Sequence, residues 1–145
     1  MRKPAPEPGL VIRYDFLWRR EYRRGRREGA KDRPCAIVVA TTSAVDGSQR
    51  VVVAITHSPP QAGTTAIELP AKVKAHLGLD AERSWIIADE LNRLSWDDPG
   101  VTPAVAGVRW AYGFLPRALV IRLRQTIRAL AQAERVKVLG RDAER

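Results

Sequence analysis

The sequence predicts a mainly β protein that ends in one long helix, with its strands closed into a small barrel. Short apolar or alternating segments recur between residues 9 and 115 and are separated by turn-forming residues, a pattern typical of a small β domain. Residues 116–132 change to helical spacing with a single apolar stripe. Closure of a short, strongly bent sheet removes its exposed edges, so we expect a barrel instead of an open sheet.

The length of 145 residues favours a single domain, which we place at residues 9–135. A domain of this size can bury a hydrophobic core without disulfides, and the single cysteine excludes a disulfide within the chain. Residues 1–8 are rich in proline and are expected to form a flexible arm. Residues 136–145 are expected to form a tail that is disordered from Gly140 to Arg145.

The charge is the most informative global property. Lysine and arginine number 25 and aspartate and glutamate 16, which gives a formal net charge of +9 at pH 7. Arginine greatly outnumbers lysine, and the planar guanidinium group is suited to binding phosphate through two parallel hydrogen bonds. A basic protein of this kind is a candidate for nucleic-acid binding, and the distribution of its charge along the chain decides whether that interpretation is favoured.

The sequence also disfavours several classes of protein and site. No apolar run approaches the roughly 20 residues of a membrane span, and the N-terminal residues lack the apolar region of a secretory signal, so we expect a cytoplasmic protein without a membrane partner. One cysteine and two histidines, His57 and His76, are too few for a structural zinc site. No Gly-rich phosphate loop or serine-nucleophile motif is present, and we expect neither metal nor cofactor.

The predicted strands follow from local patterns. Residues 10–18 alternate between apolar and other side chains, so we expect a strand with one core face. Residues 35–40 are apolar without alternation, which is typical of a strand buried on both faces, and Asp46-Gly47 predicts a hairpin to a second apolar strand at 51–55. The remaining expected strands are 64–69, 84–88, 91–96 and 109–115.

Two helices are predicted. Pro70 precedes a short helix at residues 71–77 that Gly78 closes. Pro116 opens the long helix, whose apolar side chains recur every three or four residues and are expected to pack on the barrel or on a partner. These side chains are Leu119, Leu123, Ile127 and Leu130.

The segment 19–31 lies between the first two predicted strands and is rich in arginine. Gly25 and Gly29 disfavour a persistent helix, so we expect a long, mobile loop. Such a loop suits a nucleic-acid backbone, with aromatic side chains available for base stacking, although a solvated basic loop without a partner is the alternative. The candidate RNA-binding residues are Trp18, Arg19, Arg20, Tyr22, Arg23, Arg24, Arg26, Arg27, Lys31 and, in a later loop, Ser58.

Arg33 and Thr56 are the leading catalytic candidates. Arg33 stands at the mouth of a buried strand, where Pro34 favours an extended backbone, and Thr56 ends the next strand. Cleavage of RNA by its own 2′-hydroxyl needs a base, an acid and donors for the phosphorane charge. Arg33 supplies positive charge and Thr56 supplies a hydroxyl. Glu28 supplies a carboxylate that could orient Arg33 or take a proton. His57 supplies a side chain that titrates near neutrality and could act as acid or base.

Structural interpretations of the same residues compete with these. Arg33 could pair only with Asp32 or Glu90, Thr56 could simply end its strand, and Glu28 could balance neighbouring arginines. His57 could be a surface loop residue, and His76 is expected to be one. A nucleophilic pair of Cys35 and His57 is disfavoured, because no third group is suggested to orient it and a buried strand cysteine is the simpler interpretation.

Three segments resemble the MazF/PemK (Kid) family of bacterial toxin ribonucleases. Residues 28–34, Glu-Gly-Ala-Lys-Asp-Arg-Pro, are similar to the family's E-x-x-x-x-R-P segment, and Ile55-Thr56 to its V/I-T pair. Residues 86–96, Ile-Ile-Ala-Asp-Glu-Leu-Asn-Arg-Leu-Ser-Trp, are similar to its L-A-D-Q-V-K-x-L-D-W type of segment, and the order of the three is preserved over roughly residues 9–130. The resemblance implies an SH3-like barrel with a C-terminal helix, a homodimer, metal-independent cleavage of single-stranded RNA, and silencing by an acidic antitoxin.

Two other functions remain open from the sequence. A non-catalytic nucleic-acid-binding module of the SH3-like kind would keep the basic surface without cleavage, and an interaction protein would use the charge to bind an acidic protein partner. His57-Ser58-Pro59-Pro60 replaces the family's usual small or amide residue after the threonine, and Glu90 stands where glutamine is common. Residues 97–112 have no counterpart in the resemblance.

Overall fold

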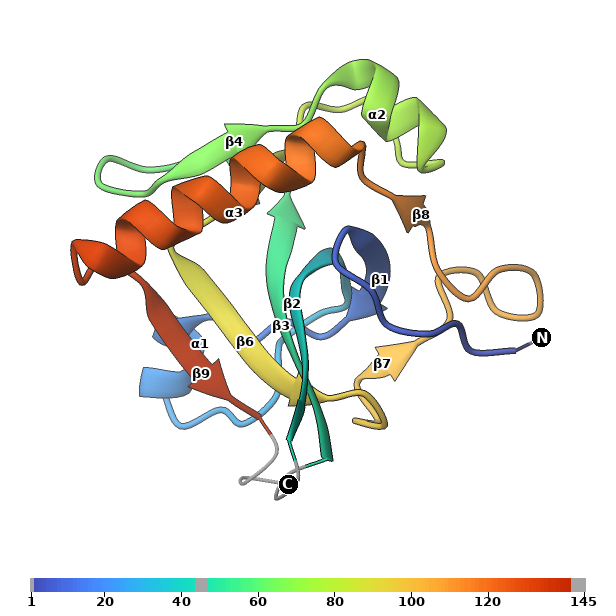
Figure 1. The fold of residues 1–145 in the computed structure, drawn as a ribbon, viewed down its shortest axis with the longest axis horizontal. Helices are drawn as coiled ribbons and strands as arrows, with labels where there is room; N and C mark the ends of the chain where they lie inside the picture. Colours follow the sequence, from blue (N-terminus) through green and yellow to red (C-terminus); the bar gives the residue numbers. More distant parts are fainter. Residues whose placement is uncertain (1, 44–46, 142–145) are drawn as a thin grey trace.

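The computed structural model describes residues 2–43 and 47–141, with the side chains of residues 40–49 left out (Figure 1). The described part is mainly antiparallel β-sheet with a C-terminal helix, as predicted. The strands are β1 Leu10–Tyr14, β2 Arg33–Ser43, β3 Gly47–Thr56, β4 Ala66–Glu68, β5 Trp85–Ile87, β6 Glu90–Ser95, β7 Val101–Thr102, β8 Gly113–Phe114 and β9 Lys137–Gly140. The helices are α1 Arg19–Arg23, α2 Ala71–His76 and α3 Arg117–Gln132.

The nine strands form one sheet built around the β2–β3 hairpin. The main path runs β4-β5-β3-β2-β1-β7, with β6 pairing β3 and β9, and with β8 pairing β1. All pairs are antiparallel except β6 with β9, which is parallel. Among the described strands, the pairings do not close the sheet into a ring, and the predicted barrel stays a prediction.

The β2–β3 hairpin confirms the prediction of two buried neighbouring strands. Cys35 lies opposite Ala54, and the register shifts by one residue between Ile37 and Val39, which is a β-bulge. Alternate side chains of β2 enter two different hydrophobic clusters, with Ala36 in one and Cys35 in the other. The predicted turn, including Asp46, falls partly outside the described residues.

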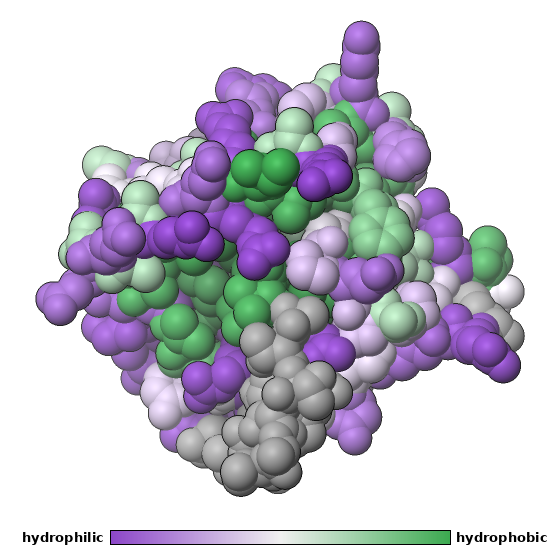
Figure 2. Space-filling view, viewed as in Figure 1, coloured by the Kyte–Doolittle hydropathy of each residue, from purple (hydrophilic) through white to green (hydrophobic). Residues whose placement is uncertain are grey.

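Helix α3 covers one of these two clusters, as the apolar stripe predicted. Leu119, Leu123 and Leu130 are buried in it, and Ile127 is partly buried against it. In Figure 1, α3 crosses the sheet and β9 leads away from its end alongside β6. On the face drawn in Figure 2, apolar side chains are gathered below α3, over β6 and β9, and polar side chains surround them.

The first strand is shorter than predicted. It spans Leu10–Tyr14, and its expected continuation to residue 18 bends away after Tyr14, where the Phe16 amide donates to the Tyr14 carbonyl at 3.0 Å. The predicted core face still holds, because Phe16 and Trp18 join the same buried cluster as Leu10. The last predicted strand, 109–115, is also longer than the observed one, since only β8 forms within it, and a two-residue β7 precedes it.

The prediction of a C-terminal tail was wrong for residues 137–141, and the disorder predicted from Gly140 onward was wrong for Gly140 and Arg141. Strand β9 pairs with β6 from Glu90↔Lys137 to Arg93↔Gly140, and Arg141 is fully buried. Its guanidinium donates to Asp15 and Asn92, so a residue near the end of the chain fastens β9 to the segment after β1. Residues 142–145 of the predicted tail lie outside the described residues.

The N-terminal residues 2–8 contain neither helix nor strand. Even so, the Lys3 ammonium donates to the Trp96 carbonyl and lies over the rings of Trp96 and Trp110, at 4.5 and 5.3 Å from their centroids. The arm is therefore joined to the domain through one side chain. No helix in the described part of the chain is long and apolar enough to cross a membrane.

Candidate active site

The ends of β2 and β3 bring Arg33 and Thr56 together. The two strands are antiparallel with Cys35 opposite Ala54, so the first residue of β2 faces the last residue of β3 across the same edge. Arg33 Nη1 lies 3.5 Å from Thr56 Oγ1, at the long limit of a hydrogen bond. The expectation that these two residues converge is confirmed.

The Thr56 hydroxyl is arranged to donate its proton to a further group. Its oxygen accepts from the Ser58 amide at 3.1 Å and from Arg33, and these contacts use both of its lone pairs. Thr56 is only 7% exposed, so its direction is fixed by these neighbours. An anionic oxygen beside it would therefore accept a hydrogen bond from the Thr56 hydroxyl and, at the same time, hydrogen bonds from the remaining guanidinium donors of Arg33.

The Arg33 guanidinium is half-buried and has no carboxylate partner within 4.0 Å in the described part of the chain. The alternatives of a pair with Asp32 or Glu90 are not realised: Asp32 pairs with Arg13 at 3.1 Å, and Glu90 accepts the Arg19 amide at 2.8 Å. Burial lowers the pKa of Arg33 from its ordinary value, with Glu21 raising it, and a guanidinium so affected stays charged at neutral pH. An unpaired, partly desolvated charge of this kind favours an anionic ligand.

Trp18 supports Arg33 and does not offer a stacking surface to solvent. The guanidinium carbons of Arg33 and Arg20 lie 5.4 and 5.2 Å from the centroid of its ring. Trp18 is 5% exposed and packs edge-on against Phe16, with the ring centroids 4.8 Å apart. The prediction that Trp18 is available to stack on a base was wrong, because its indole belongs to the core.

Two hollows meet at the Arg33–Thr56 pair, and both residues line both of them. The first, here called the His57 hollow, has a volume of about 340 Å³. Its other lining includes Lys31, His57, Lys74, Asp80, Ser84 and Tyr112. The second, the Trp18 hollow, has about 360 Å³ and is lined further by Trp18, Arg20, Ser58, Pro60, Gln61 and Glu90.

The basic segment 19–31 begins with a helix, which corrects the prediction of a loop throughout. Helix α1 is one turn long, and the Glu21 carboxylate stabilises its start by accepting the Trp18 amide at 3.0 Å. The other oxygen of Glu21 accepts the Ala30 amide at 3.2 Å, so one side chain ties together the two ends of the segment. A Cβ at Gly29 would overlap the carbonyl oxygens of Asp15 and Phe16, so only glycine permits this close approach.

The predicted RNA-binding residues of this segment differ in exposure. Arg19 is partly buried, and Tyr22 is covered by Arg27, whose guanidinium carbon lies 4.6 Å from the ring centroid. The others are exposed: Arg20, Arg23, Arg24, Arg26, Arg27, Lys31 and, in the loop after β3, Ser58. The charge is therefore presented to solvent, beside the Trp18 hollow that Arg20 and Ser58 line.

Glu28 is not brought to the Arg33–Thr56 pair. It is exposed and lines a separate hollow with Asp15 and Gly100. Its backbone carbonyl accepts from Arg26 Nε at 3.1 Å. The carboxylate that acts electrostatically on Arg33 is instead that of Glu21, which raises the pKa of Arg33 and was not among the predicted site residues.

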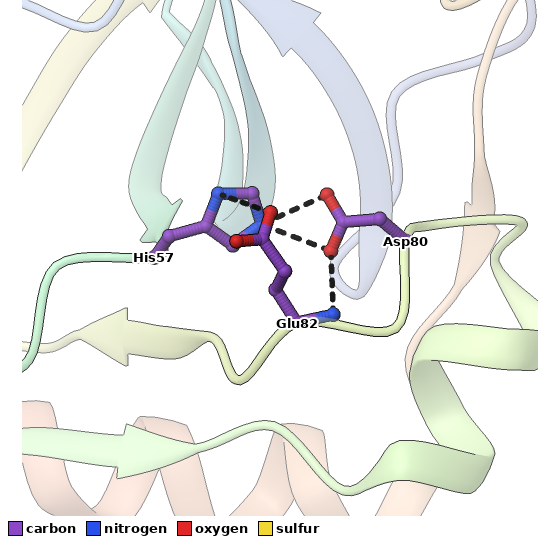
Figure 3. Close-up of side chains that lie close together, drawn as sticks. All are labelled: His57, Asp80 and Glu82. Carbon is purple, nitrogen blue, oxygen red and sulfur yellow. Dashed lines mark hydrogen bonds and ion pairs between the residues drawn. The ribbon is translucent and has the colours of Figure 1, made fainter.

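His57 lines the first hollow and has two carboxylates beside it (Figure 3). Its Nε2 lies 2.9 Å from Asp80 Oδ2, and its Nδ1 lies 3.9 Å from Glu82 Oε2. Asp80 in turn accepts from the ammonium of Lys74 at 2.8 Å. Sequence reasoning found His57 but missed Asp80 and Lys74, while His76 is exposed on α2 as expected.

The three groups of Figure 3 could hold a metal ion, although the sequence predicted no metal site. Ligand atoms of His57, Asp80 and Glu82 lie within 4.8 Å of one another. All three residues are exposed, and the Lys74 ammonium already neutralises Asp80, so a second cation would meet a like charge. The donor set is therefore better suited to holding the histidine ring than to binding an ion.

Comparison of the chain with protein-family models, with curated proteins and with solved structures finds no match.

Proposed function

We propose that this protein is a metal-independent endoribonuclease of the MazF/PemK type, the toxin component of a type II toxin–antitoxin system. In this proposal, its bent sheet is an SH3-like barrel, and its substrate is single-stranded RNA. The observation that carries the proposal is the Arg33–Thr56 pair at the junction of two hollows. A strand of RNA that occupies both hollows would have one phosphate at this junction.

The chemistry follows from the donors at the junction. Arg33 and Thr56 would both donate to the non-bridging oxygens of the phosphate, and negative charge on these oxygens grows as the 2′-oxygen attacks. The O2′–P bond forms, the P–O5′ bond breaks, and the products carry a 2′,3′-cyclic phosphate and a 5′-hydroxyl. His57 directly follows Thr56, lines the same hollow and takes the proton-transfer role. Glu28 lines neither hollow and is left without a part in this scheme.

The exposed arginines of segment 19–31 would bind the RNA backbone beyond the junction. They stand next to the Trp18 hollow, which Arg20 lines, and their side chains are exposed to solvent. Their contribution would be independent of base sequence and would weaken with salt. An acidic antitoxin would compete with RNA for this surface through charge complementarity, and we propose a homodimer as the active form.

The test is incubation of the purified protein with a long single-stranded RNA in EDTA. We expect cleavage with cyclic-phosphate ends, and we expect Arg33→Ala to lower the rate at saturating RNA by about 10²–10³, the cost of losing one oxyanion donor. Arg122→Ala is the matched control, because Arg122 is an exposed arginine of α3 that lines neither hollow. Cleavage that survives a 2′-deoxy substitution at the scissile nucleotide would refute attack by the 2′-hydroxyl.

A non-catalytic nucleic-acid-binding module is the second candidate. The observation that favours it is the exposed cluster of arginines, which needs no catalytic group to bind a phosphate backbone. Salt-dependent RNA binding without cleavage by the wild-type protein would select it. Sedimentation that shows only monomer at high micromolar concentration would contradict the proposed homodimer, whichever of the two functions holds.

A further inference from the structure

We propose that Asp80 is a positioning residue that holds the His57 ring with its proton on Nε2, which makes Nδ1 the general base for the 2′-hydroxyl. The buried Lys74 anchors Asp80 in this arrangement. This inference rests on the proposed ribonuclease function and assigns to it a dyad that lies outside the Arg33–Thr56 pair. It also assigns the direction of proton transfer, which the position of His57 alone leaves open.

Asp80 is held from several sides. Its Oδ1 accepts from Lys74 Nζ at 2.8 Å and from the Glu82 amide at 3.1 Å, and its carboxylate contacts His57 Nε2 at 2.9–3.0 Å (Figure 3). The Lys74 ammonium, above all, lowers the pKa of Asp80 from its ordinary value, with the contact to His57 adding to the effect. Asp80 is therefore an anion at neutral pH and only accepts hydrogen bonds.

Lys74 is the fixed point of the arrangement. Its side chain is only 5% exposed, and its ammonium also donates to the Glu82 carbonyl. A buried ammonium needs acceptors for its donors, and Asp80 and the Glu82 carbonyl accept two of the three. Because Lys74 is on α2 and cannot move without uncovering its charge, the Asp80 carboxylate is held toward the end of β3, where His57 follows Thr56.

The tautomer of His57 follows from this geometry. A carboxylate can only accept, so a neutral imidazole beside it carries its proton on the nitrogen that faces the carboxylate, which is Nε2. The lone pair is then on Nδ1. In the reaction, Nδ1 takes the 2′-hydroxyl proton as the O2′–P bond forms, and the leaving 5′-oxygen takes a proton from water. The imidazolium then returns its proton to the resulting hydroxide, and Asp80 stabilises the imidazolium meanwhile.

Other charged groups face His57 and must be considered in any pH profile. Glu82 is the nearest to Nδ1, at 3.9 Å, but its side chain is 75% exposed and its effect is screened by solvent. The further groups that line the same hollow are Lys31, Asp32, Arg33 and Tyr112. Of all these, only Asp80 combines a direct contact with the ring and a buried anchor, so we expect it to dominate.

The first test does not depend on RNA. Nitrogen-15 NMR of the His57 imidazole in full-length wild-type protein reports which ring nitrogen carries the proton. The spectrum is recorded at a pH at which the imidazole is neutral. We expect the Nε2–H tautomer in wild type and in Glu82→Gln, and a mixture in Asp80→Asn. A wild-type ring that is mainly Nδ1–H, or an Asp80→Asn ring that keeps the wild-type tautomer, would overturn the inference.

The second test is kinetic. We expect Asp80→Asn to lower kcat by about 10²-fold, within the range of general acid–base catalysis, with KM nearly unchanged. Glu82→Gln is the matched control and should keep kcat within about twofold, and Lys74→Met should resemble Asp80→Asn, with circular dichroism checking the fold.

The outcomes separate this inference from the proposed function. Wild-type protein that cleaves RNA, with a kcat that Asp80→Asn leaves unchanged, overturns the positioning role and keeps the ribonuclease. Wild-type protein that cleaves no RNA overturns the ribonuclease and, with it, the base assigned to Nδ1. A lowered kcat together with the changed tautomer supports both.

Discussion

Replacement of Arg141 by alanine should lower the free energy of unfolding by about 3–5 kcal/mol, the cost of removing one partner of a buried ion pair. Arg141 has a fully buried side chain, and Asp15 has one that is 14% exposed. Arg141 Nη2 lies 3.0 Å from Asp15 Oδ2, and Nη1 donates to the Asp15 carbonyl at 2.8 Å and to Asn92 Oδ1 at 3.2 Å. The guanidinium carbon also lies 4.7 Å from the centroid of the Tyr14 ring.

The magnitude follows from what alanine would leave behind. The Asp15 carboxylate would lose its cation in a place that water reaches poorly, and the cavity would add the loss of packing against Tyr14. At an m-value of about 2 kcal/mol/M, this loss moves the urea midpoint down by about 1.5–2.5 M. A domain of this size has roughly 5–15 kcal/mol of stability, so the loss is a large share of the total.

Urea unfolding followed by tryptophan fluorescence measures this change. Arg135→Ala is the matched control, since Arg135 is an exposed arginine of the same C-terminal segment and its loss should cost at most about 0.5 kcal/mol. A double-mutant cycle with Asp15→Asn should give a coupling of at least 1 kcal/mol. A loss below 1 kcal/mol for Arg141→Ala, the level of an exposed pair, would refute the view that β9 is fastened by this residue.

Three further predictions concern the site and the core. Neutralising Arg23, Arg24, Arg26 and Arg27 should flatten the slope of log affinity against log salt for single-stranded RNA by about 3 units. Neutralising the four arginines of α3 should leave the slope nearly unchanged. Binding titrations at several salt concentrations measure both slopes. Thr56→Ala should slow cleavage less than Arg33→Ala does, because a neutral hydroxyl makes a weaker bond than a guanidinium, and Thr56→Ser should stay near the wild-type rate; the reverse order would show that Thr56 carries more than a donor. Burial raises the pKa of the Cys35 thiol far above its ordinary value, so the native protein should not react with a disulfide reagent at pH 8, and rapid reaction before unfolding would contradict the buried position.

Sequence reasoning succeeded where the signal is local. The apolar run after Pro34 and the Asp-Gly turn predict β2 and β3 because periodicity and turn chemistry act between neighbours in the chain. The stripe on α3 is equally local, since side chains three and four residues apart share one face. The meeting of Arg33 and Thr56 then follows from the hairpin alone, without any knowledge of the rest of the sheet.

The failures have physical causes of their own. Strand β9 has only two apolar residues and pairs in parallel with β6, about 47 residues earlier, so no local pattern distinguishes it from a tail. Helix α1 is shorter than an isolated helix can be and exists because Glu21 and Glu90 accept its free amides. The buried position of Trp18, by contrast, was available in the sequence, because Trp18 continues the alternation that begins at Leu10 and therefore lies on the core face.

Asp80 shows how far local reasoning could have gone at the site. Gly78 has a φ of +70° and ends α2, with the Leu79 amide donating to the Lys74 carbonyl at 2.9 Å, as in a Schellman motif. This motif turns the chain back over the last turn of the helix, so the residue after Leu79 is carried toward Lys74, and the glycine at the helix end was recognised in the sequence.

What the motif does not determine is that His57 approaches the same carboxylate. That contact depends on β3 and β5 pairing, with Thr56 opposite Trp85, and on Leu77 entering the core that β3 also lines. The Lys74–Asp80 contact is therefore a local product of the helix end, whereas the Asp80–His57 contact is a product of the whole fold. A change that weakens the packing of α2 should then loosen His57 before it disturbs Arg33 and Thr56, whose contact depends on the β2–β3 hairpin alone.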